Sequence, residues 1–151
     1  SRTSISEYMA DGTRGSIKGM VPTGDIGCID EDGRLTIKGR ADDVVVTGGE
    51  NVHPAEVEEV LRLHPGIDDV AVTGRPDPVY GSVLVAHVVP ADDHLTDDEL
   101  LDWARRNLGP HHRPREVRRV AELPRNATGK VLRRVLAGEV TIDELDEEDL
   151  L

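Results

Sequence analysis

The stretch PAEVEEVLRLHPGIDDVAVTG, residues 54–74, decides the fold because it holds a helix and a strand separated by one short break. Its first half repeats apolar residues at helical spacing, and Pro54 suits the first turn of a helix. His64-Pro65-Gly66 ends this helix, and the apolar run after it predicts a strand. A helix that buries one face and leads into a strand predicts helices packed on a sheet.

The sequence after this stretch continues the same mixture of strands and helices. SVLVAHVVP is almost continuously apolar and predicts a central strand, while RPDPVYG before it predicts a loop. Thr96 and Glu99 form a capping box at the start of a helix over TDDELLDWARRNL. EVRRVAEL predicts a third strand, PRNATG a loop, and KVLRRVLAG a short helix that ends at Gly138.

The sequence before this stretch predicts a β-hairpin with its turn at Glu31-Asp32-Gly33 and a short strand at Val44-Val45-Val46. The expected fold class is therefore α+β, with a small mixed or antiparallel sheet flanked by helices and preceded by a hairpin. We expect residues 1–39 to contain this hairpin and residues 40–138 to form the compact domain. Residues 139–151 form an acidic tail, which is frayed or a marginal helix.

The composition is that of a globular protein with an aliphatic core. Aromatic residues are scarce, with one Trp, two Tyr and no Phe, so stacking platforms for single-stranded nucleic acid are nearly absent. A single cysteine, Cys28, excludes an internal disulfide and favours the cytoplasm. No apolar run approaches the roughly 18 residues that span a bilayer, so no membrane partner is expected.

The net charge of −12 is unevenly distributed. Residues 139–151 hold seven acidic residues and no basic one, whereas residues 113–134 hold eight basic residues against two acidic ones. We call residues 113–134 the basic strip. It favours a local phosphate or carboxylate partner, or a solvated face, over binding of a nucleic acid duplex.

Three short motifs carry candidate chemistry. In PTGDIG, Asp25 lies in a glycine turn at a strand start, where it suits either two vicinal hydroxyls or a simple turn. In GRADDVVVTGGENVHP, the pair Gly48-Gly49 allows close approach of backbone or ligand. In LPRNATGKVLRR, Lys130 is one of only three lysines and follows Gly129, so it suits either an anion or solvent at a helix start.

Two other kinds of site are disfavoured by spacing. Asp42, Asp43 and His53 match no metal-ligand pattern, so no metal site is predicted. The glycine spacing and the missing Ser or Thr after Lys130 exclude a Walker-type phosphate loop.

Taken together and in this order, the three motifs resemble the last three sequence motifs of the adenylate-forming superfamily, over roughly residues 22–136. That family includes acyl- and aryl-CoA synthetases, adenylation domains of peptide synthetases and beetle luciferases. The resemblance implies the small, mobile C-terminal domain, preceded by the last hairpin of a large N-terminal domain. The chain is then expected to be a piece of the enzyme or a natural truncation, and to be inactive alone.

The resemblance also implies roles for single residues. Asp25 resembles the aspartate that holds the ribose hydroxyls of ATP, and Arg40 the arginine that contacts the nucleotide near the hinge. Asp42 resembles the hinge residue. Gly48 and Gly49 resemble the loop that lines the pantetheine tunnel during thioester formation, and Lys130 the lysine that bridges the acid carboxylate and the ATP α-phosphate.

The implied function is that of an acid–thiol ligase of the AMP-forming acyl-CoA synthetases, with fatty acid metabolism as one setting. It would use ATP, Mg²⁺ and coenzyme A, held mostly by the large domain. The resemblance further implies a lysine acetyltransferase acting on Lys130 as a regulatory partner. Three alternatives stay open: a non-catalytic binding or regulatory module, an adenylation domain of another subgroup, and a nucleic-acid-binding domain that uses the basic strip.

Overall fold

The computed structural model describes residues 24–150, which divide into two compact units between Val44 and Val45. The lead-in expected over residues 1–20 lies outside the described residues. No helix within residues 24–150 is long and apolar enough to cross a membrane.

The first unit is the predicted hairpin. Strand β1 (Asp25–Ile29) pairs antiparallel with β2 (Leu35–Arg40), with a register shift between Ile26 and Gly27. The turn is closed by Asp30, whose carboxylate accepts hydrogen bonds from the backbone N–H groups of Asp32 and Arg34, each at 2.9 Å. A 3₁₀ turn, η2 (Ala41–Asp43), follows directly.

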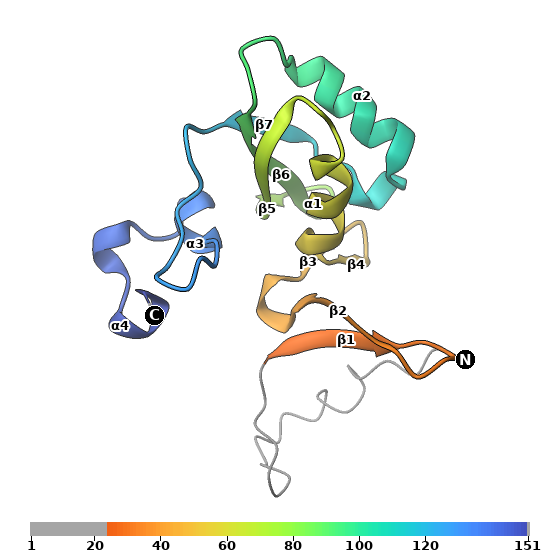
Figure 1. Cartoon of the computed structure of the whole chain (residues 1–151), viewed down its shortest axis with the longest axis vertical. Helices are drawn as coiled ribbons and strands as arrows, with labels where there is room; N and C mark the ends of the chain where they lie inside the picture. The colour runs from red at the N-terminus through yellow and green to blue at the C-terminus, as the bar shows by residue number, and fades with distance from the viewer. Residues whose placement is uncertain (1–23, 151) are drawn as a thin grey trace, which may run out of the picture. The chain divides into compact units, whose positions relative to one another are not determined.

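The second unit is built on a three-stranded sheet in the order β5 (Ile67–Asp77), β6 (Gly81–Pro90) and β7 (Glu116–Arg119), shown in Figure 1. β5 and β6 are antiparallel, whereas β6 and β7 are parallel, so the sheet is mixed, and β6 is central as predicted. A separate two-stranded sheet pairs β3 (Val45–Thr47) with β4 (Glu50–Val52). This α+β architecture confirms the predicted fold class.

The loop predicted over RPDPVYG is mostly strand. β5 continues through Pro76 to Asp77, which pairs with Gly81. The carboxylate of Asp77 accepts from the N–H groups of Val79 and Tyr80, and this closes a short turn. Pro76 is tolerated because β5 is an edge strand.

The core lies between the sheet and two helices, α1 (Pro54–Arg62) and α2 (Asp97–Asn107). Both helices match their predicted starts, and the Thr96–Glu99 capping box of α2 is present. The indole N–H of Trp103 donates to the Val60 carbonyl at 3.1 Å, which joins the two helices. The buried aliphatic residues of this core include Val57, Leu61, Val70, Val72, Leu84, Ala86, Val88 and Leu100, together with Val45 and Val52 from the β3–β4 pair.

The C-terminal helix is shorter than predicted. The helix expected to begin at Lys130 begins at Arg133, as α3 (Arg133–Leu136). The residues before it form a tight turn instead, because the Asn126 side chain accepts from the N–H groups of Thr128 and Lys130, and Val131 pairs with Arg125 in an antiparallel bridge. The acidic tail forms η4 (Ile142–Glu144) and α4 (Glu147–Leu150), in line with the expected marginal helix.

The sheet face opposite α1 and α2 buries His87, which is 2% exposed. Its Nε2 lies 2.8 Å from Oγ1 of Thr73. Burial lowers the pKa of His87 from 6.5 to about 4, and Arg118 on β7 and Arg133 on α3 add to this effect, while Glu116 opposes it. His87 is therefore neutral in the folded protein at neutral pH.

We expect His87 to make the fold acid-sensitive. Between about pH 6.5 and pH 4 the unfolded chain binds a proton at this residue and the folded chain does not, so stability falls as the pH falls through this window. From about pH 7 to about pH 5 the loss attributable to His87 is about 2 kcal/mol. The test is denaturant unfolding at about pH 7 and about pH 5 of the unmodified protein and of His87→Gln, which keeps a polar group at the Nε2 position. Between these two pH values the free energy of unfolding should fall by about 2 kcal/mol less in His87→Gln than in the unmodified protein. Equal pH dependence in both proteins would contradict the assignment.

Candidate functional site

Asp25 and Arg40, the two predicted nucleotide contacts, lie side by side at the open end of the hairpin. They are paired across β1 and β2, and Nη1 of Arg40 lies 3.6 Å from Oδ1 of Asp25. Each side chain is a little over one-third exposed, so both reach solvent. A carboxylate held beside a guanidinium offers hydroxyl groups an acceptor and phosphate groups a donor.

Asp42, the predicted hinge residue, is exposed in η2. The residues on either side of this turn, Arg40 and Val44, are both extended, with φ/ψ of −95°/145° and −61°/129°. Asp42 therefore lies in a short connection just before the division between the two units at Val44 and Val45.

Gly48 and Gly49 form the turn between β3 and β4. Gly48 has φ +57°, and its N–H donates to the carbonyl of Tyr80 at 3.0 Å. A Cβ on Gly48 would lie 2.9 Å from the ring of His111, whereas a Cβ on Gly49 would meet nothing within 4 Å. The first glycine is thus required by both its backbone conformation and its neighbour.

The surroundings of Gly48 contain three side chains that the sequence motifs did not identify. The guanidinium of Arg115 stacks on the Tyr80 ring, 4.1 Å from its centroid. His111 lies 3.9 Å from Glu50, measured from Nε2 to Oε1. These residues come from the β5–β6 turn and from the segment before β7, so only the folded sheet brings them to the glycine turn.

Lys130 directly precedes Val131 at the base of a turn that is closed by an isolated antiparallel bridge between Arg125 and Val131. Its N–H donates to the side-chain oxygen of Asn126 at 2.9 Å, and its carbonyl accepts from the Asn126 N–H at 2.9 Å. Gly129, with φ +86°, provides the left-handed residue that this turn needs. The backbone of Lys130 is therefore fixed on both sides, while the residue is exposed.

The predicted residues form three separate groups. Asp25, Arg40 and Asp42 belong to the first unit, whereas Gly48-Gly49 and Lys130 belong to the second. Within the part of the chain that the structure describes, no hydrogen bond or ion pair joins the glycine turn to Lys130. The structure thus presents the lysine and the glycine turn as two independent elements of one domain.

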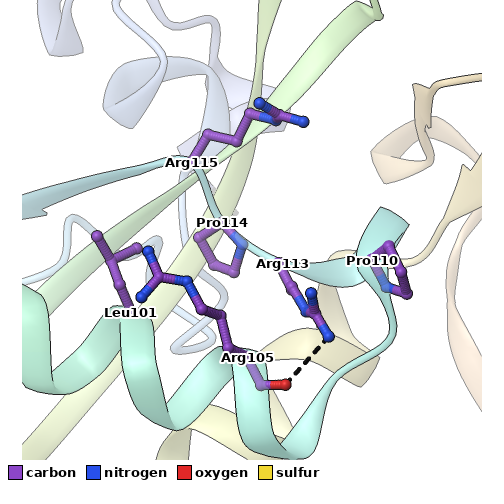
Figure 2. Close-up of a pocket in the computed structure, with 6 residues that line it drawn as sticks. All are labelled: Leu101, Arg105, Pro110, Arg113, Pro114 and Arg115. Carbon is purple, nitrogen blue, oxygen red and sulfur yellow. Dashed lines mark hydrogen bonds between the residues drawn. The ribbon is translucent and has the colours of Figure 1, made fainter.

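The arginines of the basic strip mostly have structural partners. Nη2 of Arg113 donates to the carbonyl of Arg105 on α2, at 3.1 Å, as Figure 2 shows. Its Nε donates to the Leu108 carbonyl at 3.0 Å. Others form ion pairs, namely Arg118 with Glu116, Arg119 with Asp97, Arg125 with Asp69, Arg133 with Glu58 and Arg134 with Asp149. The strip is therefore largely neutralised within the fold.

A pocket of about 360 Å³ lies between α2 and the segment that leads into β7. Figure 2 shows its lining residues, which are Leu101, Arg105, Pro110, Arg113, Pro114 and Arg115. None of the residues predicted from the sequence motifs lines it. Among the described residues, no group of three or more His, Cys, Asp or Glu side chains could hold a metal ion.

Comparison with known proteins identifies the domain. Residues 56–130 match the family described as AMP-binding enzyme C-terminal domain. The chain is 45% identical over 116 residues to a sulfoacetate–CoA ligase of Cupriavidus necator, which covers 76% of the chain and 23% of that ligase.

Solved structures agree with this match. The fold superposes with a TM-score of 0.73 and 37% identity on o-succinylbenzoate CoA synthetase from Bacillus subtilis in complex with its acyl-adenylate intermediate, covering 77% of this chain and 24% of that one. It superposes with a TM-score of 0.74 and 36% identity on an amide bond synthetase from Marinactinospora thermotolerans, covering 91% and 28%. The chain thus spans about a quarter of the length of the proteins it matches.

Proposed function

We infer that this chain, which belongs to the adenylate-forming enzymes and is their C-terminal domain, serves an ATP-dependent carboxylic acid–CoA ligase. The proposed reaction has two halves. A carboxylic acid and ATP first give an acyl-adenylate and pyrophosphate, and the thiol of coenzyme A then displaces AMP to give a thioester. The proposal of a CoA ligase is supported by the names of similar proteins, which include a sulfoacetate–CoA ligase and an o-succinylbenzoate CoA synthetase. One of these acids is aliphatic and the other is an aryl acid.

The observation that carries this proposal is the turn that presents Lys130. Both backbone groups of Lys130 are hydrogen-bonded to Asn126, while the residue itself is exposed. An ammonium on a fixed backbone can be delivered to a reaction centre without ordering a loop at the same time. We therefore assign Lys130 to the adenylation half-reaction.

The chemistry of adenylation explains the need for such a cation. The carboxylate and the α-phosphate are both anionic and repel each other, and a positioned ammonium between them holds both. Negative charge grows on the α-phosphate oxygens in the transition state, and the ammonium stabilises it. Once the adenylate has formed, this charge is no longer required at the same place.

The remaining residues are assigned to thioester formation, to nucleotide binding and to the hinge. Gly48 and Gly49 are proposed to border the path of the coenzyme A thiol in the second half-reaction. A turn without side chains lets the pantetheine arm approach the backbone closely. Asp25 and Arg40 are proposed to contact the ribose and the nucleotide, and Asp42 to act as the hinge. The domain boundary at residues 39 and 40 and the cytoplasmic location stay predictions.

The partners implied are the enzyme's own large domain, the acid and coenzyme A. Mg²⁺, like ATP and coenzyme A, is proposed to be held mostly by the large domain. No step proposed here passes through the metal. The amide bond synthetase among the similar structures keeps another adenylating subgroup as the alternative.

The test is ATP–pyrophosphate exchange by the complete native protein against a panel of aliphatic and aryl carboxylic acids. Exchange with one class of acid, followed by thioester formation on adding coenzyme A, is the expected result. Exchange without thioester formation would point to the other subgroup. Absence of exchange with every acid, in a protein that is folded, would favour a non-catalytic module.

A further inference from the structure

Two arginines flank Lys130 in the sequence, and both are tied to carboxylates of distant elements. Arg125, at the start of the turn, places Nη2 2.6 Å from Oδ2 of Asp69 on β5. Arg133, at the start of α3, forms an ion pair with Glu58 on α1. The turn that carries Lys130 is therefore attached to the helix and sheet at both of its ends.

The pair between Glu58 and Arg133 is the more buried of the two. Glu58 is 5% exposed, and its Oε1 accepts from both the Arg133 guanidinium and the backbone N–H of Val72. The same nitrogen of Arg133 donates to the carbonyl of Val72 at 2.9 Å. Arg133 thus binds a helix side chain and a strand backbone together. The other oxygen of Glu58, Oε2, lies 3.9 Å from Nη2 of Arg62, which lies 3.9 Å from Oδ1 of Asp69 as well.

The pair on the other side is partly exposed but makes a second contact with the turn. Nη1 of Arg125 donates to the carbonyl of Gly129 at 2.8 Å, while its Nη2 bonds Asp69. One guanidinium therefore links the residue before Lys130 directly to the sheet. Because the guanidinium is planar and its donors are fixed in direction, both bonds restrict the position of the turn.

Stability alone gives little reason to bury the ion pair between Glu58 and Arg133. A buried ion pair gains little over apolar residues of the same size, because both charges lose their hydration. Charged groups with fixed hydrogen-bond directions do, however, select one arrangement of the elements they join. Here the elements joined are α1, β5 and the turn with Lys130.

We propose that Glu58 and Asp69 are positioning residues for Lys130, which act through Arg133 and Arg125 to hold the turn at one place on the domain. This inference rests on the proposed function, in which Lys130 must reach a reaction centre on the large domain. The two carboxylates touch no substrate. Their loss is expected to impair adenylation and to spare thioester formation.

The test uses the complete native protein and its Glu58→Gln and Asp69→Asn variants, with Glu59→Gln as the matched control. Glu59 is the neighbouring carboxylate on α1 and is exposed. ATP–pyrophosphate exchange should fall about 10- to 100-fold in Glu58→Gln, the loss expected from misplacing a reacting group by about 1 Å. Thioester formation from a supplied acyl-adenylate should stay within about twofold of the unmodified protein. Glu59→Gln should behave as the unmodified protein in both assays.

Amide hydrogen exchange separates this inference from the proposed function. In Glu58→Gln and Asp69→Asn, the amides of residues 126–132 should exchange faster, while those of β6 and of β5 keep their protection, except at Val70 and Val72, whose N–H groups donate to the substituted carboxylates. This result supports the anchoring even if the unmodified protein shows no pyrophosphate exchange, an outcome that would refute only the proposed function. Unchanged exchange of residues 126–132, or an equal fall in both half-reactions with loss of protection throughout the sheet, would overturn the inference.

Discussion

Replacing Lys130 with alanine should lower ATP–pyrophosphate exchange by the complete native protein about 100- to 1,000-fold. The expected size is that of removing one preorganised charge from a transition state. The turn itself should persist, because its hydrogen bonds are made by the Lys130 backbone and by Asn126, not by the ammonium. Thioester formation from a supplied acyl-adenylate should therefore stay within about twofold.

Two measurements make this expectation specific. Lys130→Arg keeps the charge but changes its shape and reach, so it should recover only part of the exchange activity. Arg134→Ala removes a neighbouring exposed cation that pairs with Glu139 and Asp149, and it should leave exchange nearly unchanged. An equal loss in both half-reactions for Lys130→Ala would show that the lysine supports the fold or both reactions.

Acetylation of Lys130 should have the same selective effect as the alanine variant. The modification removes the positive charge while leaving the backbone of the turn unchanged. The complete native protein carrying acetyl-lysine at this position should lose pyrophosphate exchange and regain it after enzymatic deacetylation. Full exchange activity in the acetylated protein would refute both the assigned role and an acetyltransferase as a regulator.

The elements predicted correctly from the sequence are those specified by neighbouring residues. The helix beginning at Pro54, the Thr96 capping box and the hairpin turn at Glu31-Asp32-Gly33 each depend on a few adjacent side chains. The two wrong predictions, the loop over RPDPVYG and the helix from Lys130, involve side chains that bind nearby backbone groups. Asp77 and Asn126 each bind nearby backbone N–H groups, so a strand extends to Asp77 and a turn replaces the first residues of a helix.

The parts of the candidate site that could not be predicted depend on residues far apart in the sequence. Glu58 and Arg133 meet because α3 lies against β5, and His111 meets Gly48 because the segment before β7 passes the β3–β4 turn. No periodicity or motif in one sequence records such pairs. The motifs identified which residues carry chemistry, and the fold determines what holds them in place.

The β3–β4 turn provides the complementary prediction, because Gly48→Ala should impair the second half-reaction. The alanine must keep φ +57°, a conformation that costs an L-residue about 1–2 kcal/mol, and its Cβ would lie 2.9 Å from the His111 ring. Relief of this strain and of the contact would displace the turn, and a shift of about 1 Å near a reacting group can cost up to about 100-fold in rate, so thioester formation should fall about tenfold or more. ATP–pyrophosphate exchange should stay within about twofold, because Lys130 makes no bond to this turn.

Gly49→Ala is the matched control for the contact with His111. Gly49 also has a positive φ, +81°, but a Cβ there meets nothing within 4 Å, so only the backbone strain remains and the loss should be smaller. His111→Ala removes the ring that the new Cβ would meet. Gly48→Ala should therefore lower the thioester-forming rate less in a His111→Ala background than in the unmodified protein. If Gly48→Ala instead lowers pyrophosphate exchange and spares thioester formation, the division of the two half-reactions between Lys130 and the glycine turn is wrong.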